Sequence, residues 1–123
     1  MRTIQIAKQL RNIYDFKLFQ QSQHIGSCKL MVNDNQAVIN YMYIDDAHKN
    51  NGHGSWLLQE TEKILKDEHN VKKISLLGWQ PSGSFDIVDF YKKNGYVTSK
   101  AHSAVYDDSV TLFDLHQFYK ILK

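Results

Sequence analysis

The most informative segment of this 123-residue chain is Lys49-Asn50-Asn51-Gly52-His53-Gly54-Ser55. It separates an apolar stretch, residues 37–44, from a run with apolar residues at helical spacing, residues 57–65. Glycine has no Cβ, so Gly52 and Gly54 allow a tight turn and let a ligand approach the main chain closely. The first amides of a helix lack internal acceptors and carry partial positive charge. The segment therefore predicts a strand–loop–helix junction suited to a diphosphate.

Two side chains of this segment add to the expected anion site, since Ser55 offers a hydroxyl donor and Lys49 a positive charge. The pattern by itself is weak, because Gly-x-Gly recurs by chance and a plain helix start with two turn glycines explains it equally well. It is not a P-loop, because no Lys-Ser/Thr pair ends it. It is not a dinucleotide fingerprint, because Leu57 stands where the third glycine would be.

The chain before this segment is typical of an antiparallel meander. Apolar and polar residues alternate around Ile4, around Phe16 and around Leu30, and each alternation predicts a strand. Asn33-Asp34-Asn35 predicts a turn. The strand that follows, residues 37–44, is apolar on both faces, and we expect it to be covered on both sides.

The chain after this segment alternates between helix and strand. An amphipathic helix is expected to stop at Asn70, and residues 71–79 then form a strand. Ser84 is the expected N-cap of a second helix, which ends at Asn94-Gly95. Strands follow from Tyr96 and over residues 110–115, and the spacing of apolar residues over 115–122 predicts a short closing helix. The expected order is β-β-β-β-α-β-α-β-β.

Composition limits the function classes. The chain is 42% hydrophobic and 23% charged, which is ordinary for a soluble globular protein, and its length favours a single domain over residues 1–123. A net charge of +2 argues against a dedicated nucleic-acid binder. No apolar run is long enough to cross a membrane. The single cysteine, Cys28, excludes an internal disulfide and fits a reducing compartment, so we expect a cytoplasmic protein. The spacing of the histidines predicts no metal site.

Two segments carry a family resemblance. The stretch from Ile44 to Gly54 resembles motif A of the GNAT acetyltransferase superfamily, in which a strand precedes Arg or Gln, two residues, Gly, one residue, and Gly or Ala. The stretch Phe90-Tyr91-Lys92-Lys93-Asn94-Gly95-Tyr96 resembles the second signature of that family. The resemblance covers residues 25–97. It implies an α/β (α+β) fold with a mixed, mostly antiparallel central sheet, splayed at the cofactor site and flanked by helices.

The resemblance also implies an activity: transfer of an acetyl group from acetyl-CoA to a primary amine of a protein or small molecule. The amides of residues 50–55 would meet the diphosphate, and backbone near residues 43–45 would pair with the pantetheine arm. The implied cofactor-binding residues are Tyr43, Ile44, Asp45, Lys49, Asn50, Asn51, Gly52, His53, Gly54, Ser55 and Ser84.

The implied catalytic residue is Tyr91, as the acid that protonates the departing thiolate, although a tyrosine on an amphipathic helix is often only part of the core. A backbone amide near Ile44 is the expected oxyanion donor. The general base stays open among Asp45, His24 and His48, each of which is equally well an ordinary surface residue, and solvent can also take the proton.

Three features depart from the family pattern. Lys49 replaces the usual Arg or Gln and loses the planar fork. Ser84 stands where Asn often contacts the pantetheine arm. The region around Ile4 is too close to the next strand to hold the usual pair of helices, which often wall the acceptor site. The acceptor side is then open, completed by a second copy in a homodimer, or nonfunctional. The alternative function is a noncatalytic GNAT-fold module for CoA binding or regulation.

Overall fold

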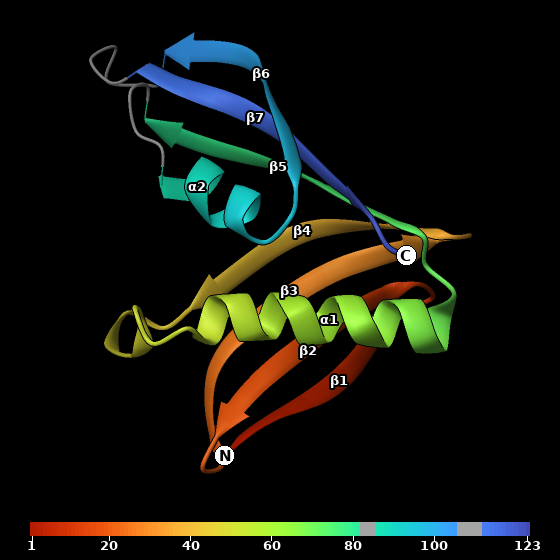
Figure 1. The fold of residues 1–123 in the computed structure, drawn as a ribbon. Helices are drawn as coiled ribbons and strands as arrows, with labels where there is room; N and C mark the ends of the chain where they lie inside the picture. The colour runs from red at the N-terminus through yellow and green to blue at the C-terminus, as the bar shows by residue number, and fades with distance from the viewer. Residues whose placement is uncertain (82–85, 106–111) are drawn as a thin grey trace. The chain divides into compact units, whose positions relative to one another are not determined.

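The computed structural model describes residues 1–81, 86–105 and 112–123, and they form two compact units. Unit 1 comprises Met1–Ile74 with Ile121–Lys123, and unit 2 comprises Ser75–Lys120. The described residues form seven strands and two α-helices, in the predicted order β-β-β-β-α-β-α-β-β (Figure 1). A short 3-10 helix, η1 (Asp46–His48), adds to that order after the fourth strand. That the chain forms a single domain stays a prediction.

Unit 1 begins with the antiparallel meander that the sequence predicts. Neighbouring strands pair in chain order, and each of the three pairings is antiparallel. The turn between the last two strands is centred on Asp34, whose φ of 54° is one that Asp and Asn tolerate better than most residues. The strands are β1 (Arg2–Leu10), β2 (Ile13–Gln20), β3 (Gln23–Asn33) and β4 (Gln36–Ile44).

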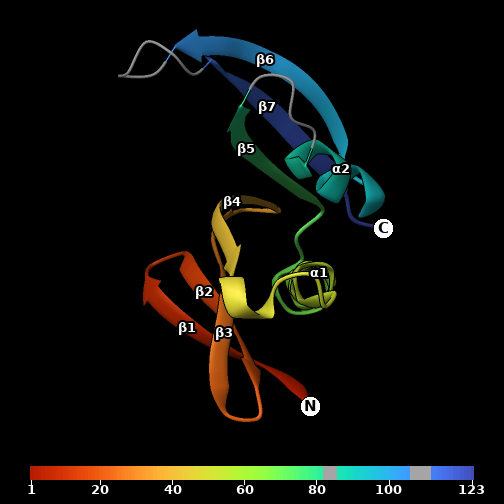
Figure 2. The ribbon, with the colours of Figure 1, turned by 90° about the vertical axis from the view of Figure 1, so that its left-hand side faces the viewer.

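The helix α1 (His53–His69) lies along one face of this meander, as Figures 1 and 2 show. Its apolar stripe supplies Leu57, Leu58 and Leu65, all fully buried. The strands contribute fully buried side chains such as Phe16 and Leu30. Burying a side chain of this size stabilises the fold by about 1.5–3 kcal/mol. The core of unit 1 therefore holds the start of α1 in place relative to the strands.

The ends of α1 follow local rules of the chain. Asn70, at φ 55°, is the C-cap, and the Val71 N–H donates to the Leu65 carbonyl at 3.0 Å. This confirms the predicted stop at Asn70, because asparagine adopts the left-handed conformation more readily than most residues.

Cys28 is fully buried on β3 and is a free cysteine. Burial, followed by the negative charge of Asp15, raises the pKa of the Cys28 thiol to about 12. The side chain is therefore a neutral apolar group of the core, as the sequence favours.

Most of unit 2 consists of three strands and one helix. The strand order is β5-β7-β6, and β6 and β7 are antiparallel. The helix ends at Lys93, directly before the predicted stop at Asn94-Gly95, and Gly95 has a φ of 92°. A Cβ at Gly78 would lie 2.9 Å from Ile87 Cδ1, so glycine there lets the helix and strand approach closely. The elements are β5 (Lys73–Pro81), α2 (Asp86–Lys93), β6 (Val97–Val105) and β7 (Leu112–Ile121).

Two sequence expectations are wrong. The closing helix over residues 115–122 is instead most of β7, in which the buried residues Asp114, His116 and Phe118 alternate with more exposed ones. Alternation places these three on one face of a strand, and the helical spacing of the apolar residues is coincidental. The strand β4 is not covered on both faces, because Val38 and Tyr41 are 38% and 55% exposed.

The expected mixed α+β fold with mostly antiparallel strands is confirmed, since the three ladders of the meander and the β6–β7 ladder are all antiparallel. Within the described ranges, no helix has both the length and the apolar character needed to cross a membrane.

Candidate cofactor-binding site

The loop from β4 to α1 is a sequence of tight turns in unit 1. After η1, Lys49 is extended, and both Asn50 and Gly52 have positive φ, at 66° and 76°. Asparagine and glycine are the residues that adopt this conformation most readily. α1 then begins at His53, directly after Gly52. The sequence therefore shapes this loop through its own backbone preferences.

The start of α1 presents peptide amides. Its first backbone bond runs from the Trp56 N–H to the Gly52 carbonyl at 3.1 Å, so the amides of His53 and Gly54 precede the helical ladder. Gly52 is the N-cap and provides no capping side chain, and the first turn of this described helix contains no acidic residue. The positive end of the helix dipole is therefore not compensated by a side chain of its own turn, as an anion site requires.

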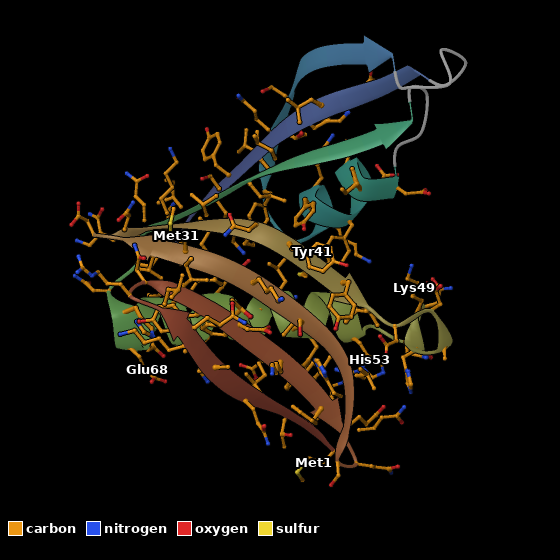
Figure 3. All side chains as sticks on the ribbon, turned by 180° about the vertical axis from the view of Figure 1, so that it is seen from behind. Met1, Met31, Tyr41, Lys49, His53 and Glu68 are labelled. Carbon is orange, nitrogen blue, oxygen red and sulfur yellow. The ribbon has the colours of Figure 1, made fainter. Side chains whose placement is uncertain are left out.

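Lys49 does not stand alone at this loop. Its Nζ lies 2.9 Å from Oδ1 of Asp46, and both side chains are exposed. The hydrogen bond with Lys49, and then its charge, lower the pKa of Asp46, while Asp46 in turn raises the pKa of Lys49. The expected positive charge is present, but a neighbouring carboxylate partly neutralises it. Figure 3 shows Lys49 and His53 at the same end of unit 1, with Met31 and Glu68 at the other.

His53 is the buried side chain of the site. It is 5% exposed, and within the described parts of the chain its Nδ1 has no hydrogen-bond partner. Burial, then the charge of Arg2 and that of His48, lower the pKa of His53. The imidazole is therefore a neutral group held at the first residue of α1.

The loop brings His48 and His53 together, with ring centroids 6.4 Å apart. Residues five positions apart do not share one face of a helix. The loop between η1 and α1 turns back, however, and so brings the two side chains close together. Among the described residues, no three His, Cys, Asp or Glu side chains form a group that could hold a metal ion.

Arg2 belongs to the site and was not predicted from the sequence. Its Nη2 donates to the Asn51 carbonyl at 3.1 Å, and its guanidinium carbon lies 5.5 Å from the centroid of the Trp56 ring. The hydrogen bond joins residues 49 positions apart. No local pattern near Arg2 identifies it, because only the pairing of the meander brings the start of β1 to this end of the sheet.

The end of β4 offers one residue, Ile44, whose backbone N–H and C=O point away from β3. The Asp45 N–H donates to the Ile25 carbonyl at 2.8 Å, and Gly26 is opposite Ile44. Hydrogen-bonded and non-bonded pairs alternate in an antiparallel ladder, so the N–H and C=O of Ile44 point away from β3. The backbone N–H of Asp45, one of the three residues predicted to meet the pantetheine arm, is therefore already bonded to β3. The backbone N–H of Ile44 is not bonded to β3.

Gly26 explains how β3 and β4 approach here. A Cβ at this position would lie 2.7 Å from the Tyr43 carbonyl oxygen. Beside it, the His24 Nε2 lies 2.9 Å from both the Gly26 carbonyl and the Ser27 hydroxyl. The His24 ring also lies 6.5 Å from that of Tyr43, so one candidate base is held beside the end of β4.

Tyr91 lies in unit 2, on α2, and is 5% exposed. Its ring lies within an aromatic cluster. The ring centroid of Tyr91 is 5.0 Å from that of Phe90, 5.4 Å from that of Tyr96 and 4.9 Å from that of Phe118. This packing fixes the ring rigidly. A fixed ring is equally suited to a positioned acid and to a core residue. Ser84 lies outside the described residues.

Comparison with protein families matches residues 14–98 to the Acetyltransferase (GNAT) domain. This match covers more than half of the chain and includes both resembling segments. The chain therefore belongs to the GNAT acetyltransferase family, which confirms the resemblance and the acetyltransferase class. A comparison with curated protein sequences found no match.

Solved structures share the fold at low identity. The ribosomal-protein-S18-alanine N-acetyltransferase from Escherichia coli superposes with a TM-score of 0.78 at 14% identity, covering 100% of this chain and 95% of that one. A GNAT family acetyltransferase from Elizabethkingia anophelis with acetyl-CoA bound gives 0.75 at 14%, covering 98% of each. An acetyltransferase from Bacillus anthracis in complex with acetyl coenzyme A gives 0.75 at 23%, and there the match spans 93% of this chain but 65% of the other.

Proposed function

We propose that this chain is an acetyl-CoA-dependent N-acetyltransferase that moves the acetyl group to a primary amine of a protein or small molecule. The observation that carries the proposal is the start of α1, where the amides of His53 and Gly54 precede the helical ladder in a loop of GNAT type. Membership of the acetyltransferase family supports acetyl-CoA as the co-substrate.

Two regions of the chain bind the cofactor in this proposal. The diphosphate accepts hydrogen bonds from the amides of residues 50–55, with charge from Lys49. The pantetheine arm pairs with backbone at the end of β4, where the Ile44 carbonyl points away from β3 and can accept a hydrogen bond. Amides of the arm match a strand edge because both are peptide-like. Ser84 is retained as a further contact to the arm.

The chemical step needs positioning more than covalent help. The neutral amine attacks the thioester carbonyl, a C–N bond forms, and the C–S bond then breaks to release the thiolate. The Ile44 N–H stabilises the oxyanion, and Tyr91 donates the proton that the thiolate takes up. The proton of the attacking amine leaves to solvent or to a base among His24, His48 and Asp45.

The alternative proposal is a noncatalytic module that binds CoA. It is favoured by the turn Arg11-Asn12, which joins β1 directly to β2 and leaves no helix there to wall an acceptor. Under this alternative the diphosphate site is retained and transfer is lost.

Two measurements with the purified chain separate these proposals. Calorimetric titration with CoA tests the binding site, and thiol release from acetyl-CoA over a panel of amines and peptides tests transfer. We expect CoA binding and amine-dependent thiol release above background hydrolysis. Binding without turnover on any acceptor contradicts catalysis and leaves the module, whereas no binding at millimolar CoA contradicts both.

We also retain two proposals of wider scope. A cytoplasmic location is supported by the single, buried thiol of Cys28. A homodimer would complete the open acceptor side beside β1 and β2, and sedimentation measurements of the purified chain test it.

A further inference from the structure

The guanidinium of Arg2 lies at the turn that begins α1, although Arg2 is on the first strand. In the meander, the start of β1, the start of β3 and the end of β4 lie at the same end of the sheet, since Arg2 pairs with Gln20 and Gly26 with Ile44. Figure 1 shows the N-terminus and the start of α1 in unit 1. The topology thus brings a distant cation to the loop.

Two contacts hold the guanidinium there, and a third distance shows how close it lies to Gly52. Nη2 donates to the Asn51 carbonyl at 3.1 Å, the guanidinium carbon lies 5.5 Å from the centroid of the Trp56 ring, and Nη2 is 3.9 Å from where a Cβ of Gly52 would be. Trp56 is itself in the first turn of α1. The cation is therefore held between the Asn51 carbonyl and the Trp56 ring, on both sides of Gly52.

The charge of Arg2 is uncompensated, unlike that of Lys49. Among the described residues, no carboxylate lies within ion-pair distance of Arg2, whereas Lys49 is paired with Asp46 at 2.9 Å. Arginine has five N–H donors in a planar fork, and Asn51 accepts from one of the terminal nitrogens. The buried, unpartnered Nδ1 of His53 lies at the same turn. The turn thus combines exposed donors, an unpaired cation and an unsatisfied polar atom.

We propose that Arg2 is a cofactor-binding residue, whose guanidinium holds the Asn51–Gly52 turn and supplies a planar cation to the diphosphate of CoA. Arg2 thereby supplies the planar guanidinium that Lys49, in place of the usual Arg or Gln, does not provide. This inference rests on the proposed function, because it names a further residue of that same site. The 3′-phosphate is an alternative target that the test distinguishes.

The test compares Arg2→Gln and Arg2→Lys with the unchanged chain. A charge-assisted hydrogen bond lost from a bound anion weakens binding about tenfold to a hundredfold. We expect Arg2→Gln to raise Kd for CoA and for dephospho-CoA by the same factor in that range, and Arg2→Lys to recover part of the loss. KM for acetyl-CoA should rise while kcat changes little, as expected when ground-state and transition-state binding weaken together.

Arg11→Gln is the matched control. It removes the same charge from an exposed arginine in the turn after β1, and it should leave Kd within about twofold of the unchanged chain. Thermal unfolding of each variant shows whether the fold is kept. If Arg2→Gln does not fold, Arg2→Lys decides, because it keeps the charge and the stem.

The outcomes separate this inference from the function on which it rests. An unchanged Kd in a folded Arg2→Gln variant, or in Arg2→Lys where Arg2→Gln does not fold, overturns the role of Arg2 and leaves the proposed function standing. A loss seen with CoA but absent with dephospho-CoA overturns the diphosphate assignment in favour of the 3′-phosphate. Failure of the unchanged chain to bind CoA overturns the proposed function and this inference with it.

Discussion

His53 combines a helix-start position with a side chain withdrawn from water. Its imidazole is 5% exposed, and burial, Arg2 and His48 together lower the pKa of His53 below the ordinary value of 6.5. The sequence of this loop predicts that the backbone of His53 binds the cofactor, but it does not show that the side chain of His53 is buried. The charge of Arg2 acts on His53 from the start of β1, and no local pattern connects these two residues.

The lowered pKa of His53 predicts a loss of stability in acid. The unfolded chain takes up a proton at His53 near pH 6.5, and the folded chain does so only at lower pH, so the free energy of unfolding falls as pH drops below about 6.5. Urea unfolding between pH 8 and pH 5 should show a smaller decline for His53→Asn than for the unchanged chain. The same series with His24→Asn controls for loss of any histidine, and identical declines in all three chains would refute this assignment.

Tyr91 is held in its aromatic cluster by contacts of the ring, which phenylalanine preserves. Removing only the hydroxyl in Tyr91→Phe should lower kcat about a hundredfold, if it is the general acid, and leave KM for acetyl-CoA unchanged. The pH–rate profile should lose its basic limb. Tyr96→Phe, in the same cluster, is the matched control and should keep kcat. An unchanged kcat and pH profile in Tyr91→Phe would assign Tyr91 to the core alone.

At the scale of elements, α1 depends on two left-handed residues, Gly52 before it and Asn70 at its end. Among the residues that the structure describes, a Cβ at Gly52 would meet only Arg2 Nη2, at 3.9 Å, so the cost of a side chain there is conformational. Glycine is required by the backbone at this position, and it also keeps the amides of the turn accessible.

Gly52→Ala should therefore lower the free energy of unfolding by about 1–2 kcal/mol, the cost of a left-handed alanine. It should also weaken CoA binding, because the strained turn moves the amides of His53 and Gly54. Asn70→Ala places the same strain at the other end of α1 and should lower stability while preserving Kd for CoA. Chemical denaturation and calorimetry measure both quantities. Equal CoA affinity in Gly52→Ala and the unchanged chain would show that the turn does not bind the cofactor.

The strands and helices differ in how well local pattern predicts them. The meander and α1 follow from alternation and from a stop at Asn70, because each of these elements exposes one face and buries the other. The sequence pattern fails over part of β7, because its buried face carries polar residues, Asp114 and His116, while its apolar residues fall by chance at helical spacing. A pattern of hydrophobic residues does not reveal a buried polar face.

At the scale of the molecule, the sequence predicts the order of elements and the loop after β4, both of which are local features. It does not predict contacts that depend on register across several strands. The bond from Arg2 to the Asn51 carbonyl spans 49 residues and needs three consecutive antiparallel pairings to form. The ion pair of Lys49 with Asp46 is local, since the two residues are three positions apart, but the motif predicts only a ligand as the partner of the lysine.

The two units can be examined in one experiment on the intact chain. Amide resonances of a ¹⁵N-labelled sample, followed while CoA is added, report every backbone N–H separately. The account predicts that the largest, saturable shifts fall on residues 50–55, at the turn before α1 and in its first residues. Saturable CoA binding with those amides unmoved, and the shifts confined to other residues, would contradict it.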